Sequence, residues 1–225
     1  MYPELPSISY EGFDLIAVAS KKYAKELAEN GFRTTYIPQG TNTSLFKHKP
    51  QKNGIDLLFV GSRHSEDDYR PSVKYAIQND FPVHVYGIRW EGHISPKYLK
   101  GNFISNNDLH KYYSSAKIIL NDHRQDMREA GFVANRIFDV TASQGFIISD
   151  YMPEIEEIYG DSIPMWHNEV EFKNLVNYYL NHPEERAKKS QKAHKITMKN
   201  YTIDAIGARF EEEIKKLFQE RKSKN

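Results

Sequence analysis

The 225-residue sequence contains no cysteine, which excludes disulfides, thiolate metal sites and a cysteine nucleophile. It has no apolar run approaching the roughly 18–20 residues of a membrane-spanning helix. The opening residues, MYPELPSISY, have neither the basic nor the apolar region of a signal peptide. With a net charge of +1, the protein has neither the basic field that attracts nucleic acid nor the acidic field that attracts a cationic partner. These absences favour an ordinary cytoplasmic globular protein that neither spans a membrane nor binds nucleic acid.

The Gly-x-Gly-x-x-Gly fingerprint of ordinary dinucleotide-binding domains is also absent, although one strand ends in a glycine. The apolar run IDLLFV at 55–60 is followed directly by Gly61, Ser62 and Arg63. A glycine here lets the backbone approach a ligand closely, and free N–H groups beside Ser62 and Arg63 could bind a phosphate oxygen. A simple turn after the strand is the competing interpretation.

Short apolar runs alternate with helical patterns along the whole chain. This alternation predicts a doubly wound, Rossmann-like α/β fold with a mostly parallel sheet. We expect a main domain over residues 51–200, preceded by a small β-α-β piece within residues 1–50. A C-terminal helix within 201–225 is expected to pack back on that piece. Expected strands include 13–18, 34–37, 55–60, 83–86, 102–104, 116–120 and 146–149, and expected helices include 21–30, 72–79, 108–115, 135–144, 169–180 and 183–199.

The stretch 116–150 carries the densest set of polar residues that could form a ligand site. An apolar strand at 116–120 leads into a polar loop, and a helix from about 135 leads to the next strand at 146–149. This order places loop residues at the carboxyl edge of a parallel sheet, where ligands bind in such folds. The loop contains Asn121, Asp122, His123, Arg124, Arg128, Glu129, Gly131 and Phe132.

The start of the predicted helix resembles an anion site. Backbone amides near Asn135 combine there with the Arg136 guanidinium and the positive end of the helix dipole. Asp139 lies one turn further on the same face, where its carboxylate could accept two sugar hydroxyls. The alternative is an ordinary capped helix with Arg136 and Asp139 joined as a surface (i, i+3) ion pair. A metal site at His123 and its acidic neighbours matches no zinc or EF-hand spacing, so no metal or other cofactor is expected.

The run KIILNDHR at 117–124, the segment DMREAGFVANRIFD at 126–139 and the closing stretch 142–150 resemble the C-terminal half of GT-B glycosyltransferases. The resemblance is strongest to the CgeB-like branch, which is related to the large retaining families of group 1 and family 4. It also includes Pro153-Glu154-Ile155, the helix start HPEER at 182–186, and Tyr201-Thr202. It covers about residues 10–215.

The resemblance implies a domain that binds a nucleotide-diphosphate sugar as substrate, without a metal. In similar enzymes an acid-x7-acid pattern contacts the donor sugar and the ribose; here Asp139 matches the second acid, and Gly131 stands at the first. Glu129 is then the nearest substitute for the first acid, and His123 is a second catalytic candidate. The diphosphate would be bound by Gly61, Ser62, Arg63, Arg124, Gly131, Phe132, Asn135 and Arg136.

The resemblance also implies a retaining transfer to a glycan or similar acceptor. Most of the acceptor-side domain is missing from this sequence, so a further domain or a partner chain would have to supply it. Two other functions fit the same residues: a non-catalytic nucleotide-sugar-binding module of an assembly, and another GT-B enzyme such as a nucleotide-sugar epimerase.

Overall fold

Six parallel strands form the central sheet of the computed structural model, which describes residues 9–52, 54–63 and 70–223. The strand order is β5-β4-β3-β6-β7-β8. The strands β4 and β5 therefore lie on one side of β3. The later strands β6, β7 and β8 lie on the other side. The strands are β3 (Leu57–Val60), β4 (Val83–Tyr86), β5 (Leu99–Gly101), β6 (Ile118–Leu120), β7 (Ile147–Asp150) and β8 (Met165–Trp166).

This strand order confirms the doubly wound fold. The strands β3 and β6 pair with Leu57 opposite Ile118, and the strand order reverses at this pair. In open α/β sheets, ligands bind outside the carboxyl ends of the strands at such a switch point. The residues that directly follow β3 and β6 therefore form the candidate location of a ligand site.

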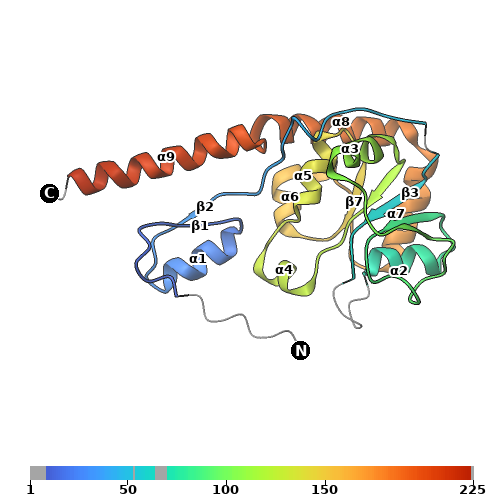
Figure 1. Cartoon of the computed structure of the whole chain (residues 1–225), viewed down its shortest axis with the longest axis horizontal. Coiled ribbons are helices and arrows are strands. Elements are labelled where there is room, and N and C mark those ends of the chain that lie inside the picture. The colour runs from blue at the N-terminus through green and yellow to red at the C-terminus, as the bar shows by residue number, and fades with distance from the viewer. Residues whose placement is uncertain (1–8, 53, 64–69, 224–225) are drawn as a thin grey trace.

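Helices cover both faces of the sheet (Figure 1). Alternate residues of β3 point to opposite faces, so Leu57 and Phe59 belong to one apolar cluster and Leu58 to the other. This explains why the strand is a continuous apolar run with no polar alternation. One face is covered by α2 (Pro71–Gln78) and α7 (Glu169–Asn181); the other is covered by α3 (Asn106–Ser115), α5 (Asn135–Ala142), α6 (Pro153–Tyr159) and α8 (Pro183–Asn200).

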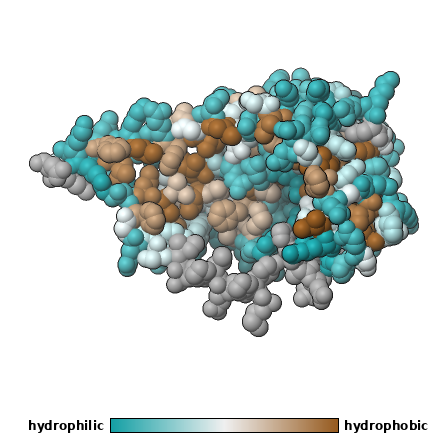
Figure 2. Space-filling model, in the orientation of Figure 1, coloured by the Kyte–Doolittle hydropathy of each residue, from teal (hydrophilic) through white to brown (hydrophobic). Residues whose placement is uncertain are grey.

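The N-terminal residues form a separate small lobe. Its two parallel strands, β1 (Ile16–Val18) and β2 (Thr34–Tyr36), are connected by α1 (Lys21–Glu29). The terminal helix α9 (Ile203–Lys222) extends away from the main domain along this lobe (Figure 1). Ion pairs join Arg33 to Glu220, at 2.6 Å, and Asp14 to Arg221. Figure 2 shows apolar residues gathered on this side of the molecule, where Phe13 and Phe218 are exposed.

Several local predictions were wrong. The loop after β6 contains a helix, α4 (Gln125–Ala130); none of its residues is buried, so it has no apolar periodicity to detect. The strand expected at 102–104 is β5 at Leu99–Gly101, an edge strand with little apolar character. The helix expected to begin at 108 begins at Asn106, because the Ser105 side chain accepts a hydrogen bond from Asn107 N–H. A short 3-10 turn, Gly160–Ser162, precedes β8.

Candidate functional site

The guanidinium of Arg136 lies at the switch point between β3 and β6. Its Nη1 donates a hydrogen bond to Oδ1 of Asn121, which directly follows β6, over 2.8 Å. A Cβ atom placed on Gly61, which directly follows β3, would lie 2.9 Å from Nη2 of Arg136. Glycine at position 61 therefore leaves room for the guanidinium, and one side chain from α5 contacts both strand ends.

Arg136 is poorly solvated and has no ion-pair partner within the described residues. Its Cζ atom lies 5.3 Å from the centre of the Phe59 ring, and burial lowers the pKa of the guanidinium. The nearby carboxylate of Asp122 is already bound by Arg70, whose Nε lies 2.5 Å from Oδ1. A desolvated cation without a paired carboxylate favours the approach of an anion. The surface ion pair between Arg136 and Asp139, offered above as the alternative, is not formed.

The first turn of α5 adds backbone donors to this cation. The N–H groups of Asn135 and Arg136 belong to the first helical positions, which have no acceptor within their own helix. No acceptor elsewhere in the described ranges bonds to either group. Ala134 precedes the helix and has no side chain that could cap it. The helix start and the guanidinium together offer an anion several donors and a favourable dipole.

Asp139 is buried one turn further along α5. Its Oδ1 accepts a hydrogen bond from Thr41 Oγ1 and its Oδ2 accepts one from Asn135 Nδ2, each over 2.8 Å. Burial raises the pKa of this carboxyl from its ordinary 3.8 to about 6. A carboxylate has about four lone-pair sites, so two remain for further donors. The predicted contact with ribose hydroxyls is compatible with these bonds and stays a prediction.

The raised pKa of Asp139 predicts a specific pH dependence. Between about pH 4 and pH 6 the folded state binds more protons at this residue than the unfolded state, so stability falls as pH rises through that window. A shift from 3.8 to about 6 corresponds to about 3 kcal/mol. Asp139→Asn should therefore be more stable than the wild type at pH 8, by an amount that denaturant titration can measure, and equally stable near pH 4.

Asp161→Asn is the matched control for this titration. Lys192 and Lys189 lower the pKa of the Asp161 carboxyl, so this variant should lose stability where Asp139→Asn gains it. An Asp139→Asn variant that is less stable than the wild type at pH 8 would show that the buried carboxylate is favourable where it is.

The loop after β3 uses most of its N–H groups within the protein. The N–H of Gly61 bonds to Tyr86 O at 2.8 Å and that of Arg63 to Ile88 O at 3.3 Å. The expectation of free donors at these two positions is therefore wrong, because β4 continues beside the loop and supplies the acceptors. Ser62 Oγ accepts from Ile88 N–H, and the buried Arg63 side chain donates to Arg89 O at 3.4 Å. The N–H of Ser62 has no acceptor among the described residues.

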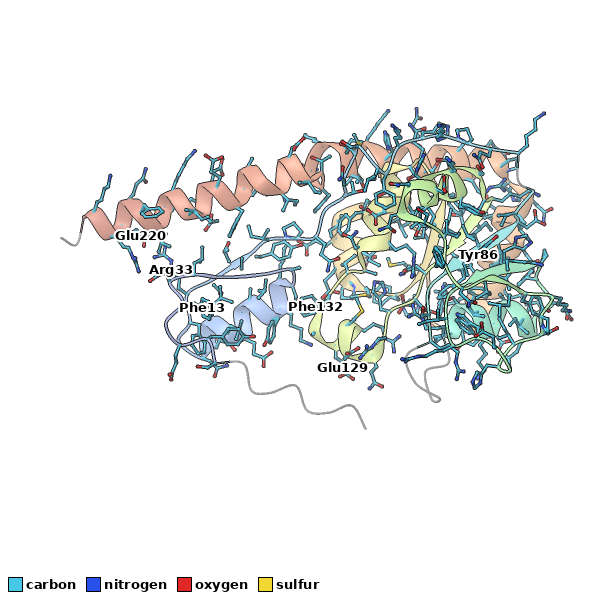
Figure 3. All side chains as sticks on the ribbon, in the orientation of Figure 1. Phe13, Arg33, Tyr86, Glu129, Phe132 and Glu220 are labelled. Atoms are coloured by element: carbon cyan, nitrogen blue, oxygen red, sulfur yellow. The ribbon has the colours of Figure 1, made fainter. Side chains whose placement is uncertain are left out.

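Three of the predicted residues, Glu129, Gly131 and Phe132, lie beside the small lobe, and the fourth, Arg124, precedes α4. Gly131 ends α4 with φ +73°, and a Cβ there would lie 2.6 Å from Glu154 Oε1. Figure 3 shows Phe132 directed towards α1, where its ring lies 6.1 Å from that of Tyr23. The exposed Glu129 side chain accepts from Gln125 Nε2 at 2.7 Å. Arg124 pairs with Asp126 through two bonds, at 2.6 and 3.1 Å.

His123 is buried at the end of β6 and both ring nitrogens are bonded. Nδ1 lies 2.7 Å from Asp150 Oδ1, and Nε2 accepts the backbone N–H of Ala134 at 3.0 Å. Although burial alone would raise it, hydrogen bonds from His123 hold the pKa of Asp150 below its ordinary value. The catalytic role expected for His123 stays a prediction, and the geometry gives the ring no free lone pair for a base.

Two residues that sequence reasoning did not select complete the surroundings of Arg136. Arg70 neutralises Asp122, and its Cζ lies 5.2 Å from the same Phe59 ring that Arg136 covers. Trp90 donates its indole N–H to Gly61 O at 2.8 Å, which fixes the loop after β3. Asp122 stands two positions after a predicted strand, in the polar loop that the sequence indicated as a candidate site. Its partner is 52 positions away in the chain, and no local pattern connects them.

A surface depression of about 530 Å³ lies at the opposite, amino edge of the sheet. Ala116 and Lys117, which precede β6, contribute to its lining. The C-termini of α3 and α5 also lie there, represented by Ser115 and Gln144. Helix C-termini carry negative partial charge and disfavour anions. The first residue of α8, Pro183, and the basic residues Arg186 and Lys188 also line the depression, so its charges are mixed.

Neither a metal-binding cluster nor a membrane-spanning helix is found in the part of the chain that the structure describes. No three His, Asp or Glu side chains gather there in a way that could hold a metal ion. None of the described helices is long and apolar enough to cross a bilayer.

Comparisons with known proteins identify the family and the fold. The model of a family described as glycosyl transferase-like matches residues 53–212. The spore protein CgeB of Bacillus subtilis is 27% identical over 216 residues, covering 87% of this chain and 66% of its own length. This chain thus spans just under two thirds of that relative.

Two solved structures share the fold at low sequence identity. Sucrose-phosphate synthase from Thermosynechococcus elongatus is 13% identical with a TM-score of 0.69, over 93% of this chain and 59% of the synthase. Anabaena Alr3699/HepE, solved in complex with UDP-glucose, is 12% identical with a TM-score of 0.68, over 90% of this chain and 64% of that protein. At these identities the likeness concerns the fold, and it confirms the arrangement of a GT-B half.

Proposed function

The chain belongs to the glycosyl transferase-like family, and from that premise we propose that it is the donor-binding half of a glycosyltransferase whose donor is a nucleotide-diphosphate sugar. The observation that carries the proposal is the half-buried Arg136 guanidinium at the switch point, without a carboxylate partner in the described ranges and next to two unbonded helix-start amides. This arrangement suits a diphosphate, which presents several anionic oxygens at once.

Different residues bind different parts of the donor in this proposal. The Arg136 guanidinium and the N–H groups of Asn135 and Arg136 bind the diphosphate. Asp139 accepts the ribose hydroxyls through its remaining lone pairs, and the Ser62 N–H faces the phosphates across from α5. During transfer, negative charge builds up on the departing nucleoside diphosphate. A fixed guanidinium and helix dipole stabilise this charge without reorganisation.

Within this proposal the transfer is retaining and the acceptor is a glycan or a similar hydroxyl-bearing molecule, as the resemblance implies. The whole relatives are longer than this chain, so acceptor contacts would come from a domain or partner chain beyond it. The Anabaena protein is described in complex with UDP-glucose and also with UDP and glucose, which makes a uridine donor the first to test.

A non-catalytic nucleotide-sugar-binding module is the second candidate. It is favoured by the position of the two residues expected to be catalytic. Both ring nitrogens of His123 are bonded, and Glu129 lies exposed on α4 towards the small lobe. Slow release of sugar from a bound donor, measured by chromatography, would favour the enzyme; tight binding without turnover in the presence of a glycan acceptor would favour the module.

Isothermal titration with UDP, GDP, ADP and their glucose conjugates tests the proposal. We expect one nucleoside diphosphate to bind with a Kd in the micromolar range, and inorganic diphosphate to bind the same site more weakly, because it lacks the ribose contact with Asp139. Absence of binding by every nucleotide, in a protein that melts cooperatively, would refute the donor-site proposal.

A further inference from the structure

Two consecutive side chains after β6 each accept a backbone N–H at the start of a helix. One of these helices, α2, lies about 50 positions earlier in the chain, and the other, α5, lies about ten positions later. Asp122 Oδ2 accepts the N–H of Ser72 at 2.9 Å, in the first turn of α2. His123 Nε2 accepts the N–H of Ala134 at 3.0 Å, immediately before α5. The end of β6 therefore fixes the starts of two helices, and one of them is the helix that carries Arg136.

The bonds around His123 determine its tautomer. A backbone N–H can only donate, so Nε2 must be unprotonated in order to accept it. The ring proton then sits on Nδ1 and is donated to Asp150 Oδ1 over 2.7 Å. Asp150 is itself held by Ser149 Oγ at 3.0 Å and by Arg128 Nη1 at 3.2 Å. The carboxylate is thus fixed from several sides and locks both the orientation and the tautomer of the ring.

We propose that His123 is a positioning residue of the donor site: by holding the N–H of Ala134, it sets where α5 begins and directs the next two amides and the Arg136 guanidinium to the switch point. This inference rests on the proposed function, because it assigns His123 to the diphosphate site and not to the chemical step. A histidine acting as a general base would need a free lone pair, and this ring has none.

The bond matters because Ala134 has no capping side chain of its own. If the His123 acceptor were lost, the N–H of Ala134 would have to turn outward to water or remain unbonded. The turn at 131–134 would then be free to change direction, and the first N–H groups of α5 would turn with it. Misplaced donors lose the geometry that a diphosphate requires.

Two isosteric substitutions separate the two ring contacts. The amide of glutamine reaches approximately as far as Nε2, so His123→Gln retains an acceptor for Ala134 N–H and loses the contact with Asp150. The amide of asparagine reaches approximately as far as Nδ1, so His123→Asn retains the contact with Asp150 and loses Ala134. We expect His123→Asn to weaken UDP binding about ten-fold and His123→Gln to stay within about three-fold of the wild type.

Amide hydrogen exchange and calorimetry on the same samples give the two readouts. Exchange at residues 134–136 should accelerate in His123→Asn and remain slow in His123→Gln. Equal UDP affinities in the two variants, or unchanged exchange in His123→Asn, would overturn the proposal. A loss of turnover in His123→Gln at unchanged affinity would overturn it as well, because that is the signature of a base.

The wild-type protein supplies a test that does not depend on whether the variants fold. Nitrogen-15 NMR of the His123 ring at pH 7.5 should show the tautomer protonated at Nδ1; protonation at Nε2 would overturn the proposal. If the wild type binds no nucleotide, the proposed function fails, and the tautomer and the exchange at 134–136 still decide whether His123 holds the start of α5.

Discussion

The Gly87→Ala variant is expected to lose a large part of its stability, together with any affinity for nucleotide. Gly87 directly follows β4 and has φ +155°, in a region that L side chains rarely adopt. An added Cβ would lie 2.2 Å from Gly61 O and 2.6 Å from Gly61 C, both in the backbone. Overpacking and backbone strain each cost about 1–3 kcal/mol, so their sum of about 2–6 kcal/mol is a large part of the roughly 5–15 kcal/mol that stabilises a domain. Thermal unfolding followed by circular dichroism measures the loss.

Gly92→Ala is the matched control because it isolates the conformational part of the effect. Gly92 also has a positive φ, +76°, but nothing lies within 4 Å of an added Cβ. This variant should lose only about 1 kcal/mol and should bind nucleotide normally. If Gly87→Ala and Gly92→Ala melt within about 2 °C of each other, the close approach of the β3 and β4 loops has no energetic importance.

Replacing Arg136 with alanine is expected to weaken binding of a nucleoside diphosphate by about 30- to 100-fold. Loss of one charge-assisted hydrogen bond to the diphosphate costs about 1.5–3 kcal/mol, a range that includes this change in affinity. Arg136→Lys should recover part of the loss, because it keeps the charge but not the planar pair of donors. Calorimetric titration with UDP, or with whichever nucleoside diphosphate binds most tightly, measures the ratio.

Arg124→Ala is the informative control for this experiment. Arg124 was also predicted to bind the diphosphate, but its guanidinium pairs with Asp126 in the first turn of α4. We expect this variant to bind nucleotide as the wild type does. A large loss of nucleotide affinity in Arg124→Ala, with little change in Arg136→Ala, would indicate that the diphosphate binds at α4 and not at α5.

The sequence was sufficient to predict most strands of the sheet and the start of α5, because those features are local. The apolar run at 57–60 is buried on both faces and therefore contains no polar residue. The helix start at Asn135 was predicted correctly from the turn before it and the apolar residues after it. The polar loop after β6 predicted a site at the carboxyl edge of the sheet, because ligands bind at that edge in parallel α/β folds, and this location stays a prediction.

The contacts that decide each residue's role depend on the register between distant segments. Asp122 pairs with Arg70, and Asp139 accepts from Thr41, 98 positions away. The N–H of Gly61 is not available because Tyr86 O lies opposite it. No spacing in the sequence shows these partners. The helix α4 was missed for a different reason: a helix with no buried residue has no apolar stripe.

Gln144 ends the α5 region in a backbone conformation that is unusual for a residue other than glycine. It follows α5 with φ +56°, a conformation that glycine adopts without strain. The glycine stands one position later, where a Cβ on Gly145 would lie 2.5 Å from Tyr113 O. The chain therefore keeps the close packing of α5 against α3 at Gly145 and leaves a strained residue at the helix end. Gln144 lies beyond the C-terminus of α5, at the end opposite to the candidate site.

A crystal structure of the protein with the most tightly bound nucleoside diphosphate tests the central claim most directly. The account predicts phosphate oxygens within hydrogen-bonding distance of the Asn135 and Arg136 N–H groups and of the Arg136 guanidinium, with the ribose next to Asp139. A nucleotide found instead in the depression at the amino edge of the sheet, or against α4 with no contact to Arg136, would contradict it.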